Sequence, residues 1–303
     1  MEIATAQQRQ AGKINWITAI PIGIFHILAI WAFFTFSWAN LAVFLIFWWL
    51  IGSVGIGLGF HRQLTHRGFQ SPNWVKHTLA IFGSMALQGS SNDWVTTHRL
   101  HHQFTETEKD PHSPRYGLFF SHIGWVLRGT SQVNGEEVEK RYIPDLLKDK
   151  FLVGLSKYWY LPTIVAGIIL GLIGGWSMVL WGIFLPVTLN WHFTWFVNSV
   201  THVWGSRRFE TTDDSTNNWW VAILSWGEGW HNNHHAHPVS ARHGLTWYEI
   251  DMNWMQIRLL EKLGLVWNVK ALDLKALEAK QKVKEVVVAA AIDETPEFWQ
   301  QAA

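Results

Sequence analysis

The stretch that decides the fold is HRLHH at residues 98–102, where three histidines stand at positions i, i+3 and i+4. A helix places residues at these spacings on one face, so His98, His101 and His102 are expected to reach a single site. The same spacing returns in GEGWHNNHHAHP, which contains HNNHH at residues 231–235. Two copies of this pattern in one chain predict that both segments meet in space at a metal centre.

A third group of histidines lies in GFHRQLTHRGF, where His61 and His66 are five residues apart. An α-helix turns two residues at this spacing partly away from each other. The spacing therefore predicts either a helix end near this point or ligands that are given to two different metal ions.

Composition limits what these histidines can bind. The 303 residues contain no cysteine, which excludes thiolate zinc sites, iron–sulfur clusters and disulfide bonds. Any metal must therefore be held by nitrogen and oxygen. Acidic and basic residues nearly balance, at 23 and 24, which argues against a nucleic-acid-binding protein. The 22 tryptophans and the 49% apolar residues are typical of a membrane protein with aromatic residues at its lipid boundaries.

Apolar stretches predict an all-α integral membrane fold with four transmembrane helices in two hairpins. Residues 14–38 and 41–60 are each long enough to cross a bilayer and are separated only by residues 39–40. Residues 158–204 are roughly twice the length that one crossing needs, with a glycine-rich turn at 174–177. We read residues 1–270 as a single membrane domain, followed by a charged tail at 271–303 that includes an amphipathic helical segment.

Shorter features complete this picture. The glycines of GSVGIGLG at 52–59 have no strand before them, so they favour close helix contact over nucleotide binding. Apolar pieces at 78–87 and 117–127 are too short to span and predict buried or interfacial helices.

The predicted topology provides an independent test of the metal centre. An even number of crossings separates the three histidine groups, so all of them lie on one side of the membrane. Lysine and arginine are concentrated in the tails and the long loop, which assigns that side, with both termini and the histidine groups, to the cytoplasm.

Eight imidazoles are too many for one ion and indicate two metal ions. Nitrogen-rich ligation with open positions is typical of iron that activates oxygen. Four nearby carboxylates are candidates to hydrogen-bond the distal ring nitrogens and orient the ligands. They are Glu106, Glu108, Asp110 and Glu228.

In this order between two hairpins, HRQLTH, HRLHH and HNNHH resemble the three histidine boxes of the membrane fatty acyl desaturases, and in particular the delta-9 group. DPHS at 110–113, SHIGW at 121–125 and NSVTHVWG at 198–205 resemble segments of that group as well. The resemblance, over about residues 14–270, implies a mushroom-shaped fold, with four membrane helices and a cytoplasmic helical cap that holds two iron ions and the active site. It adds His202 as a ninth histidine ligand and Asn198 as the residue that holds a metal-bound water. The complete implied ligand set is His61, His66, His98, His101, His102, His202, His231, His234 and His235, with Asn198 through water.

The resemblance also implies the reaction, in which the di-iron centre uses O2 and two external electrons to place a cis double bond in a bound acyl chain. An unactivated methylene has no acidic proton, so an oxidised metal must abstract hydrogen, and water must be excluded. Four residues of the second and fourth spans are candidates to line a kinked acyl tunnel. They are Phe60, Trp191, Trp195 and Phe196.

The substrate's head group is read from where basic residues are missing. Acyl-CoA members of the family hold phosphates with polar and basic side chains just before the second box and just after SHIGW, and these places here read Thr96-Thr97 and Arg128-Gly129-Thr130. We therefore expect a C16–C18 chain esterified to a membrane glycerolipid, with acyl-CoA as the alternative. The HPGG motif of a fused cytochrome b5 domain is missing, so a separate ferredoxin or cytochrome b5 is expected to supply electrons.

Three other functions stay open at this stage. A related membrane hydroxylase would use the same boxes and insert oxygen. A zinc-dependent membrane hydrolase needs fewer histidines and usually a paired carboxylate or an HExxH motif, which the sequence lacks. A metal transporter would place its ligands inside the spans rather than beyond their ends.

Overall fold

The computed structural model describes residues 12–128, 135–274, 276 and 277. Every regular element in these ranges is helical, which confirms the all-α prediction, and extended pairing is limited to isolated bridges such as Ser206 with Asn217. Three helices are long and apolar enough to cross a membrane: Trp16–Thr35, Trp38–Thr65 and Leu161–His202. The amphipathic segment predicted in the tail lies mostly outside the described residues.

The first two long helices form a hairpin. The first comprises α2 (Trp16–Ala32) and η1 (Phe33–Thr35), and the second comprises α3 (Trp38–Trp48) and its continuation η2 (Trp49–Thr65). The turn falls earlier than the predicted residues 39–40, because Ser37 caps α3 and its Oγ accepts a hydrogen bond from the Asn40 backbone N–H at 3.1 Å. Asn40 lies inside the helix, and its side-chain amide donates back to the Thr35 carbonyl at 2.8 Å.

The third apolar stretch reverses its direction at Gly175, where φ is 68° and ψ is −164°. A Cβ built on Gly171 would lie 3.5 Å from Val179 Cγ2, and one on Gly167 would lie 3.8 Å from Ile183 Cγ1. An unbroken helix would separate residues 167 and 183 by about 24 Å. The stretch is therefore an antiparallel pair of arms, as the glycine-rich turn predicted. Its elements are α9 (Leu161–Val179), η6 (Leu180–Phe184), α10 (Leu185–Ser199) and η7 (Val200–His202).

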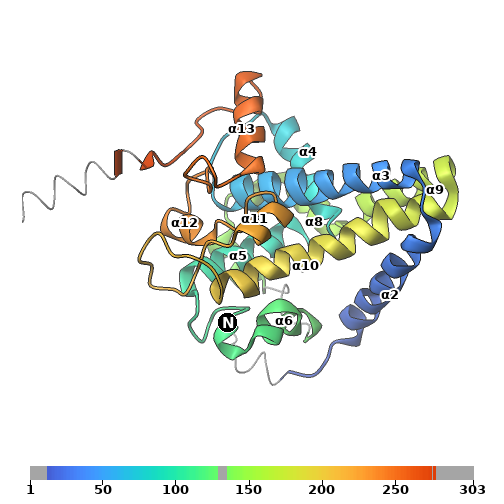
Figure 1. Cartoon of the computed structure of the whole chain (residues 1–303), viewed down its shortest axis with the longest axis horizontal. Helices are drawn as coiled ribbons and strands as arrows, with labels where there is room; N and C mark the ends of the chain where they lie inside the picture. Colours follow the sequence, from blue (N-terminus) through green and yellow to red (C-terminus); the bar gives the residue numbers. More distant parts are fainter. Residues whose placement is uncertain (1–11, 129–134, 275, 278–303) are drawn as a thin grey trace, which may run out of the picture.

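Shorter helices surround the end of the molecule that carries the histidines. In Figure 1 the long helices α2, α3, α9 and α10 extend toward one end, whereas α5, α11 and α12 gather at the other. The apolar pieces predicted as short helices become α4 and the pair η4 and α6. Between the long hairpins lie α4 (Asn73–Ser84), α5 (Ser91–Phe104), η3 (Pro114–Tyr116), η4 (Phe120–Gly124), α6 (Trp125–Leu127), α7 (Glu136–Tyr142), η5 (Leu146–Lys148) and α8 (Lys150–Lys157). After them come α11 (Trp219–Leu224), α12 (His231–Ala236) and α13 (Met252–Lys262).

The glycines of η2 allow close contact with α4, as predicted. A Cβ on Gly59 would lie 2.9 Å from the Leu79 carbonyl oxygen, and one on Gly55 would collide with the backbone at Phe82. Any larger residue at these positions would push η2 away from α4. The glycines therefore fix where the histidines at the end of η2 lie.

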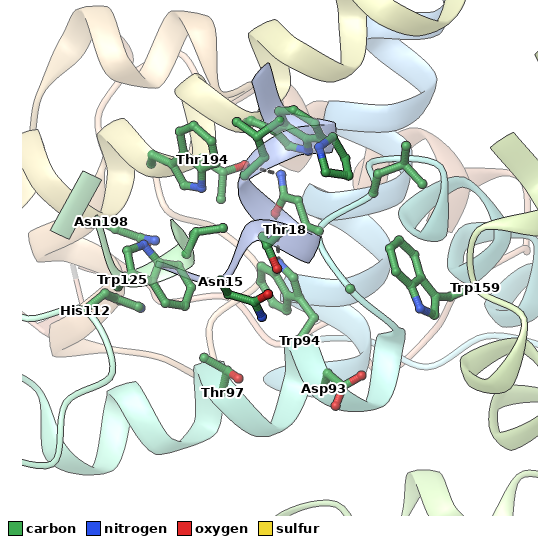
Figure 2. Close-up of a pocket in the computed structure, with 18 of the residues that line it drawn as sticks. Asn15, Thr18, Asp93, Trp94, Thr97, His112, Trp125, Trp159, Thr194 and Asn198 are labelled. Atoms are coloured by element: carbon green, nitrogen blue, oxygen red, sulfur yellow. Dashed lines mark hydrogen bonds between the residues drawn. The ribbon is translucent and has the colours of Figure 1, made fainter. Parts of the chain in front are cut away.

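A cavity of about 560 Å³ lies beside the histidines, among α2, α5, α6 and α10. Figure 2 shows Asp93 and Trp159 at one end of this cavity and His112 and Asn198 at the other. A second void of about 40 Å³ shares Trp94, His98, Thr194 and Asn198 with the larger one. The two spaces therefore meet next to the second histidine segment.

Candidate metal centre

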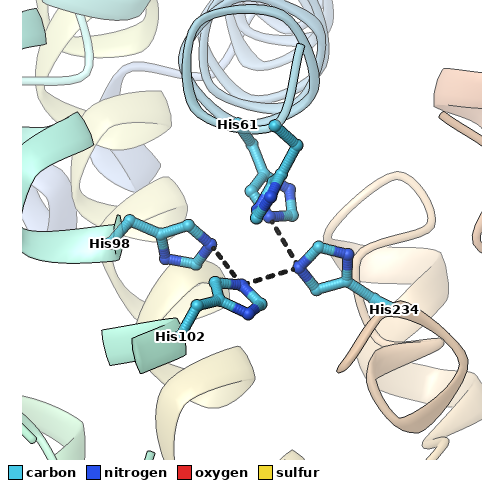
Figure 3. A group of neighbouring side chains, drawn as sticks. His61, His98, His102 and His234 are labelled. Carbon is cyan, nitrogen blue, oxygen red and sulfur yellow. Dashed lines mark hydrogen bonds between the residues drawn. The ribbon is translucent and has the colours of Figure 1, made fainter. Parts of the chain in front are cut away.

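The structure brings the nine predicted histidines into two adjacent clusters. One contains five histidines and the other contains four, and within each cluster one ring nitrogen per residue lies within 4.8 Å of all the others. Figure 3 shows four members of the larger cluster converging from three segments of the chain. The five-histidine cluster is His61, His66, His98, His102 and His234. The four-histidine cluster is His101, His202, His231 and His235.

The second and third histidine segments each serve both clusters. On α5, His98 and His102 belong to the five-histidine cluster and His101 belongs to the other. On α12 the i, i+4 pair belongs to the four-histidine cluster, and His234 reaches the opposite one. The expectation that each segment serves a single site is therefore wrong. On a helix, residues four apart differ by about 40° in direction, and the residue three positions after the first is rotated by about 60° the other way, so one helical face can supply two adjacent clusters.

In the first histidine segment, His61 and His66 lie together rather than apart. His61 and His66 lie in one cluster with ring centroids 4.8 Å apart, which argues against the alternative that they are given to two different metal ions. The other alternative is confirmed, because η2 ends at Thr65 and His66 is its C-cap. The backbone N–H of His66 donates to the His61 carbonyl at 3.1 Å, which is an i→i+5 bond. A turn of this π type places residues five apart on one face and is often found at functional sites.

Carboxylates hold the outer nitrogens of four of the rings, as predicted for Glu106, Asp110 and Glu228. Glu108 is exposed and takes no part, whereas Asp213 was missed by the sequence analysis. Asp213 lies in a loop 22 residues before its partner, so no local spacing could have identified it. The pairs are His61 Nδ1 with Glu228 Oε2 at 2.6 Å, His101 Nδ1 with Asp110 Oδ1 at 2.9 Å, His202 Nδ1 with Glu106 Oε1 at 2.8 Å and His235 Nδ1 with Asp213 Oδ2 at 2.9 Å.

These carboxylates determine which ring nitrogen faces inward. An ionised carboxylate only accepts hydrogen bonds, so each of the four rings carries its proton on Nδ1 and presents the lone pair of Nε2 to the cluster. Burial would raise the pKa of Glu228, but Arg62 and His61 beside it hold that pKa well below its usual range. His101 likewise outweighs burial and keeps the pKa of Asp110 low.

Burial also keeps cluster histidines neutral. Desolvation lowers the pKa of His98 and His234 well below the ordinary value, and neighbouring imidazoles lower it further. The same holds for His66, His102, His231 and His235. Neutral imidazole is the form that binds a metal ion.

The arrangement fits a metal ion in each cluster. The Nε2 atoms of His61 and His234 are 3.1 Å apart, and those of His202 and His231 are 3.0 Å apart. Two nitrogens bound at right angles to one ion at about 2.1 Å would have about this separation. In addition, buried Nε2 atoms of His66, His101 and His235 have no hydrogen-bond partner among the described residues. A cation would satisfy these lone pairs, whereas an apolar core would leave them unsatisfied.

The candidate lining residues divide into two groups. Trp191 and Trp195 line the larger cavity, and Asn198 lines both spaces. Phe60 lines neither and packs on Trp94, with ring centroids 5.9 Å apart. Phe196 lines neither and packs on Trp220. The cavity also contains His98, which joins it directly to the five-histidine cluster.

Two further histidines that the sequence did not single out as ligands lie close to the clusters. His112 borders the larger cavity, and its ring centroid lies 4.3 Å from that of His101. His243 packs on His234 with ring centroids 4.4 Å apart, and its Nδ1 lies 3.2 Å from Glu228 Oε2. Both rings therefore pack behind cluster members and help to fix their orientation.

Comparison with known proteins agrees with this geometry. The family model described as fatty acid desaturase matches residues 36–269. The chain is 45% identical over 277 residues to the sn-1 stearoyl-lipid 9-desaturase of Anabaena variabilis, covering 91% of this chain and 100% of that protein. It is 43% identical to the sn-2 palmitoyl-lipid 9-desaturase of Nostoc, covering 85% and 90% of the two chains. It is also 43% identical to the icosanoyl-CoA 5-desaturase of Limnanthes douglasii, covering 88% and 74%.

These matches cover most of the chain and include all nine clustered histidines. The residues that converge in the structure thus lie inside the matched region, and the apolar helices fit an enzyme that works at a membrane. The chain belongs to the fatty acid desaturase family of oxidoreductases.

Proposed function

We propose that this protein is a di-iron delta-9 desaturase that acts on a saturated C16–C18 acyl chain of a membrane glycerolipid. The observation that carries the proposal is that two buried histidine clusters lie next to a cavity of about 560 Å³. Two of the relatives are named as 9-desaturases of stearoyl-lipid and palmitoyl-lipid.

The nine histidines would hold two iron ions, one in each cluster. The all-nitrogen donor set with carboxylates behind it suits iron better than a structural zinc site. The four-histidine ion has one protein ligand fewer, and we assign Asn198 to hold a water on the centre, because this side chain borders both spaces.

When bound, the irons would reduce O2 and remove hydrogen from two adjacent methylenes. The acyl chain gives up two hydrogens, a donor gives two electrons, two protons come from solvent, and O2 becomes two waters. The protein's own part is to bind the chain and exclude water. Trp94, Trp191 and Trp195 are each less than one-tenth exposed and form apolar walls beside His98.

The membrane arrangement follows from the helix lengths. We assign four crossings, because the stretch Leu161–His202 reverses at Gly175 and so provides two arms. The histidine clusters would then form a cap on one side, and we assign that side to the cytoplasm because lysines and arginines are concentrated in the tails and the long loop.

The head group is assigned from charge. Among the described residues that line the cavity there is no lysine or arginine, and the phosphates of an acyl-CoA would require such residues. Arg99, the basic residue of the second histidine segment, already donates to Asp145 at 2.8 Å and to the Tyr142 carbonyl at 2.7 Å. Arg128 donates to the Gly12 carbonyl at 2.7 Å. Residues 129–130 lie outside the described part of the chain.

The electron donor is assigned to a separate protein, a ferredoxin or cytochrome b5 that docks on the cap. Cysteine is absent and no HPGG haem motif occurs, so the sequence offers no ligand set for a second redox group. Purified protein should therefore not turn over from NAD(P)H alone. Steady turnover without any added protein would overturn this part of the proposal.

The decisive experiment is expression in a host that lacks unsaturated fatty acids, followed by chromatography of the fatty acids from each lipid class. We expect monounsaturated C16 and C18 chains with the double bond at carbon 9. A hydroxylated product would reject desaturation. Labelled stearoyl-CoA and stearoyl-glycerolipid, supplied separately to membranes with acyl transfer blocked, test the head group, and desaturation of the thioester alone would reject the lipid-linked substrate.

A further inference from the structure

Among the described residues that line the larger cavity, the most exposed ones lie at one end. Its wall residues Trp191 and Trp195 are 5% and 4% exposed, and His112 at the end next to the clusters is 2% exposed. In contrast, Ile17 is 87% exposed and Tyr160 is 42% exposed, although both line the same cavity. The cavity therefore opens between the first turn of α2 and the residue that precedes α9.

This mouth lies at the boundary of the apolar helices. Ile17 is the second residue of the candidate span Trp16–Thr35, and Tyr160 immediately precedes the candidate span Leu161–His202. Trp159 also lines the cavity there, as Figure 2 shows at the end that carries Asp93. Tryptophan and tyrosine at such positions are typical of the lipid–water interface. The mouth therefore faces the edge of the bilayer rather than the top of the cap.

On the side away from α9, hydrogen bonds hold α2 against α10 and α6. His26 Nε2 lies 2.9 Å from His192 Nε2 on α10, and His192 Nδ1 lies 3.0 Å from His122 Nε2 on η4. The Asn15 backbone N–H donates to the Leu127 carbonyl at 2.8 Å. This chain of imidazoles satisfies the two intramembrane histidines, His26 and His192, inside the bundle. It also closes the α10 side of α2, so access is left to the α9 side.

We propose that the acyl chain of a bilayer glycerolipid enters the cavity sideways, between α2 and the start of α9, while its head group stays at the membrane surface. The inference rests on the proposed function and adds the route to it. A lipid that remains in the leaflet needs only to slide its tail past Ile17 and Tyr160 to reach His98. Entry from the cap would require displacement of the buried end at His112.

The absence of cysteine makes this route testable by site-directed labelling. Single variants Ile17→Cys and Tyr160→Cys place a thiol on each edge of the mouth. Matched controls are Ile27→Cys on α2 and Ile168→Cys on α9, which are 66% and 59% exposed and do not line the cavity. Each variant is reconstituted in phosphatidylcholine vesicles that contain stearoyl-glycerolipid, and turnover with a bulky maleimide is compared with turnover of the same variant before labelling.

We expect the label to raise the KM for the glycerolipid at least tenfold at either edge of the mouth and to change it less than twofold at the controls. A direct readout that does not depend on turnover is photolabelling with a glycerolipid that carries a diazirine on its acyl chain. Its adducts should fall on residues 15–25 and 159–160. Equal effects of the maleimide at all four positions, or adducts confined to the cap, would overturn the route while glycerolipid desaturation by the parent protein still stands. A parent protein that desaturates only acyl-CoA would overturn both proposals.

Discussion

Replacing Glu106 by glutamine should release one metal ion and leave the other. Glu106 is 4% exposed, and its Oε1 accepts from His202 Nδ1 at 2.8 Å while its Oε2 accepts from the Asp214 backbone N–H at 2.5 Å. Both neighbours are donors. A glutamine must therefore turn its NH2 group toward one of them, whichever way the amide is placed.

The size of the effect follows from this mismatch. A buried donor that loses its acceptor costs about 1–3 kcal/mol, and loss of an outer partner of a metal-bound histidine typically weakens metal binding by about 10–100-fold. The two figures agree, because each factor of ten is about 1.4 kcal/mol. The loss should be confined to the four-histidine cluster, since His202 belongs to that cluster alone.

The assay is iron per chain, measured by mass spectrometry after dialysis against increasing concentrations of a chelator. The parent protein should retain two ions over the range in which Glu106→Gln retains one. Glu108→Gln, an exposed acid two residues away, is the matched control and should behave like the parent. Glu228→Gln should release the ion of the five-histidine cluster instead. Equal loss of both ions from Glu106→Gln, or no loss, would refute the assignment of this carboxylate to one cluster.

Three further predictions concern the scaffold. Gly59→Ala should lower the melting temperature, because overpacking between η2 and α4 costs about 1–3 kcal/mol. Gly23→Ala is the control, since Gly23 has open space around it, and its melting temperature should not fall. Equal melting temperatures of the two variants would contradict the close contact between η2 and α4. Burial opposes ionisation of Asp149, but Lys76 and the other hydrogen-bond donors around this carboxylate hold its pKa at about 2, below the ordinary 3.8. The ionised carboxylate therefore stabilises the fold fully above pH 3.8, and this stabilisation disappears toward pH 2. Melting of Asp149→Asn should accordingly fall below the parent at neutral pH and converge with it in acid. His192→Phe removes both hydrogen bonds of the imidazole chain and should destabilise by about 1 kcal/mol with unchanged iron content; loss of iron would place this residue in the metal centre.

The sequence was sufficient to predict the convergence of the histidines, because helical spacing and the absence of cysteine leave few alternatives. The sequence was not sufficient to assign each histidine to one of the two clusters. Their division depends on the i→i+5 turn between His61 and His66 and on the way α5 and α12 pack, and neither feature has a local sequence signal. Asn198 and His202 came from the family resemblance alone. Asp213 needed the folded chain, since its partner is distant in sequence.

The boundaries of the apolar helices show the same limit. The first turn was placed at residues 39–40 because the apolar pattern weakens there, but Ser37 supplies the helix cap and moves the turn to the preceding residues. The candidate lining residues were chosen from the second and fourth spans, whereas the larger cavity is lined by the first and fourth, so only Trp191 and Trp195 among the candidates face it. Hydropathy identifies a span, whereas the face that each residue presents depends on the rotation of the helix.

The two clusters differ in the number of carboxylates that hydrogen-bond their histidines, so the two metal sites are not equivalent. Among the described residues, three carboxylates hydrogen-bond rings of the four-histidine cluster, whereas Glu228 alone does so for the five-histidine cluster. Glu228 is itself engaged by Arg62, whose Nε donates to it at 3.0 Å, and by Asn253 at 2.7 Å. More negative charge close to an ion stabilises its higher oxidation state, while the fifth imidazole adds a neutral donor to the other ion. Two irons bound as proposed should therefore differ in how readily they are oxidised, and the larger cavity reaches the clusters through His98 of the five-histidine cluster.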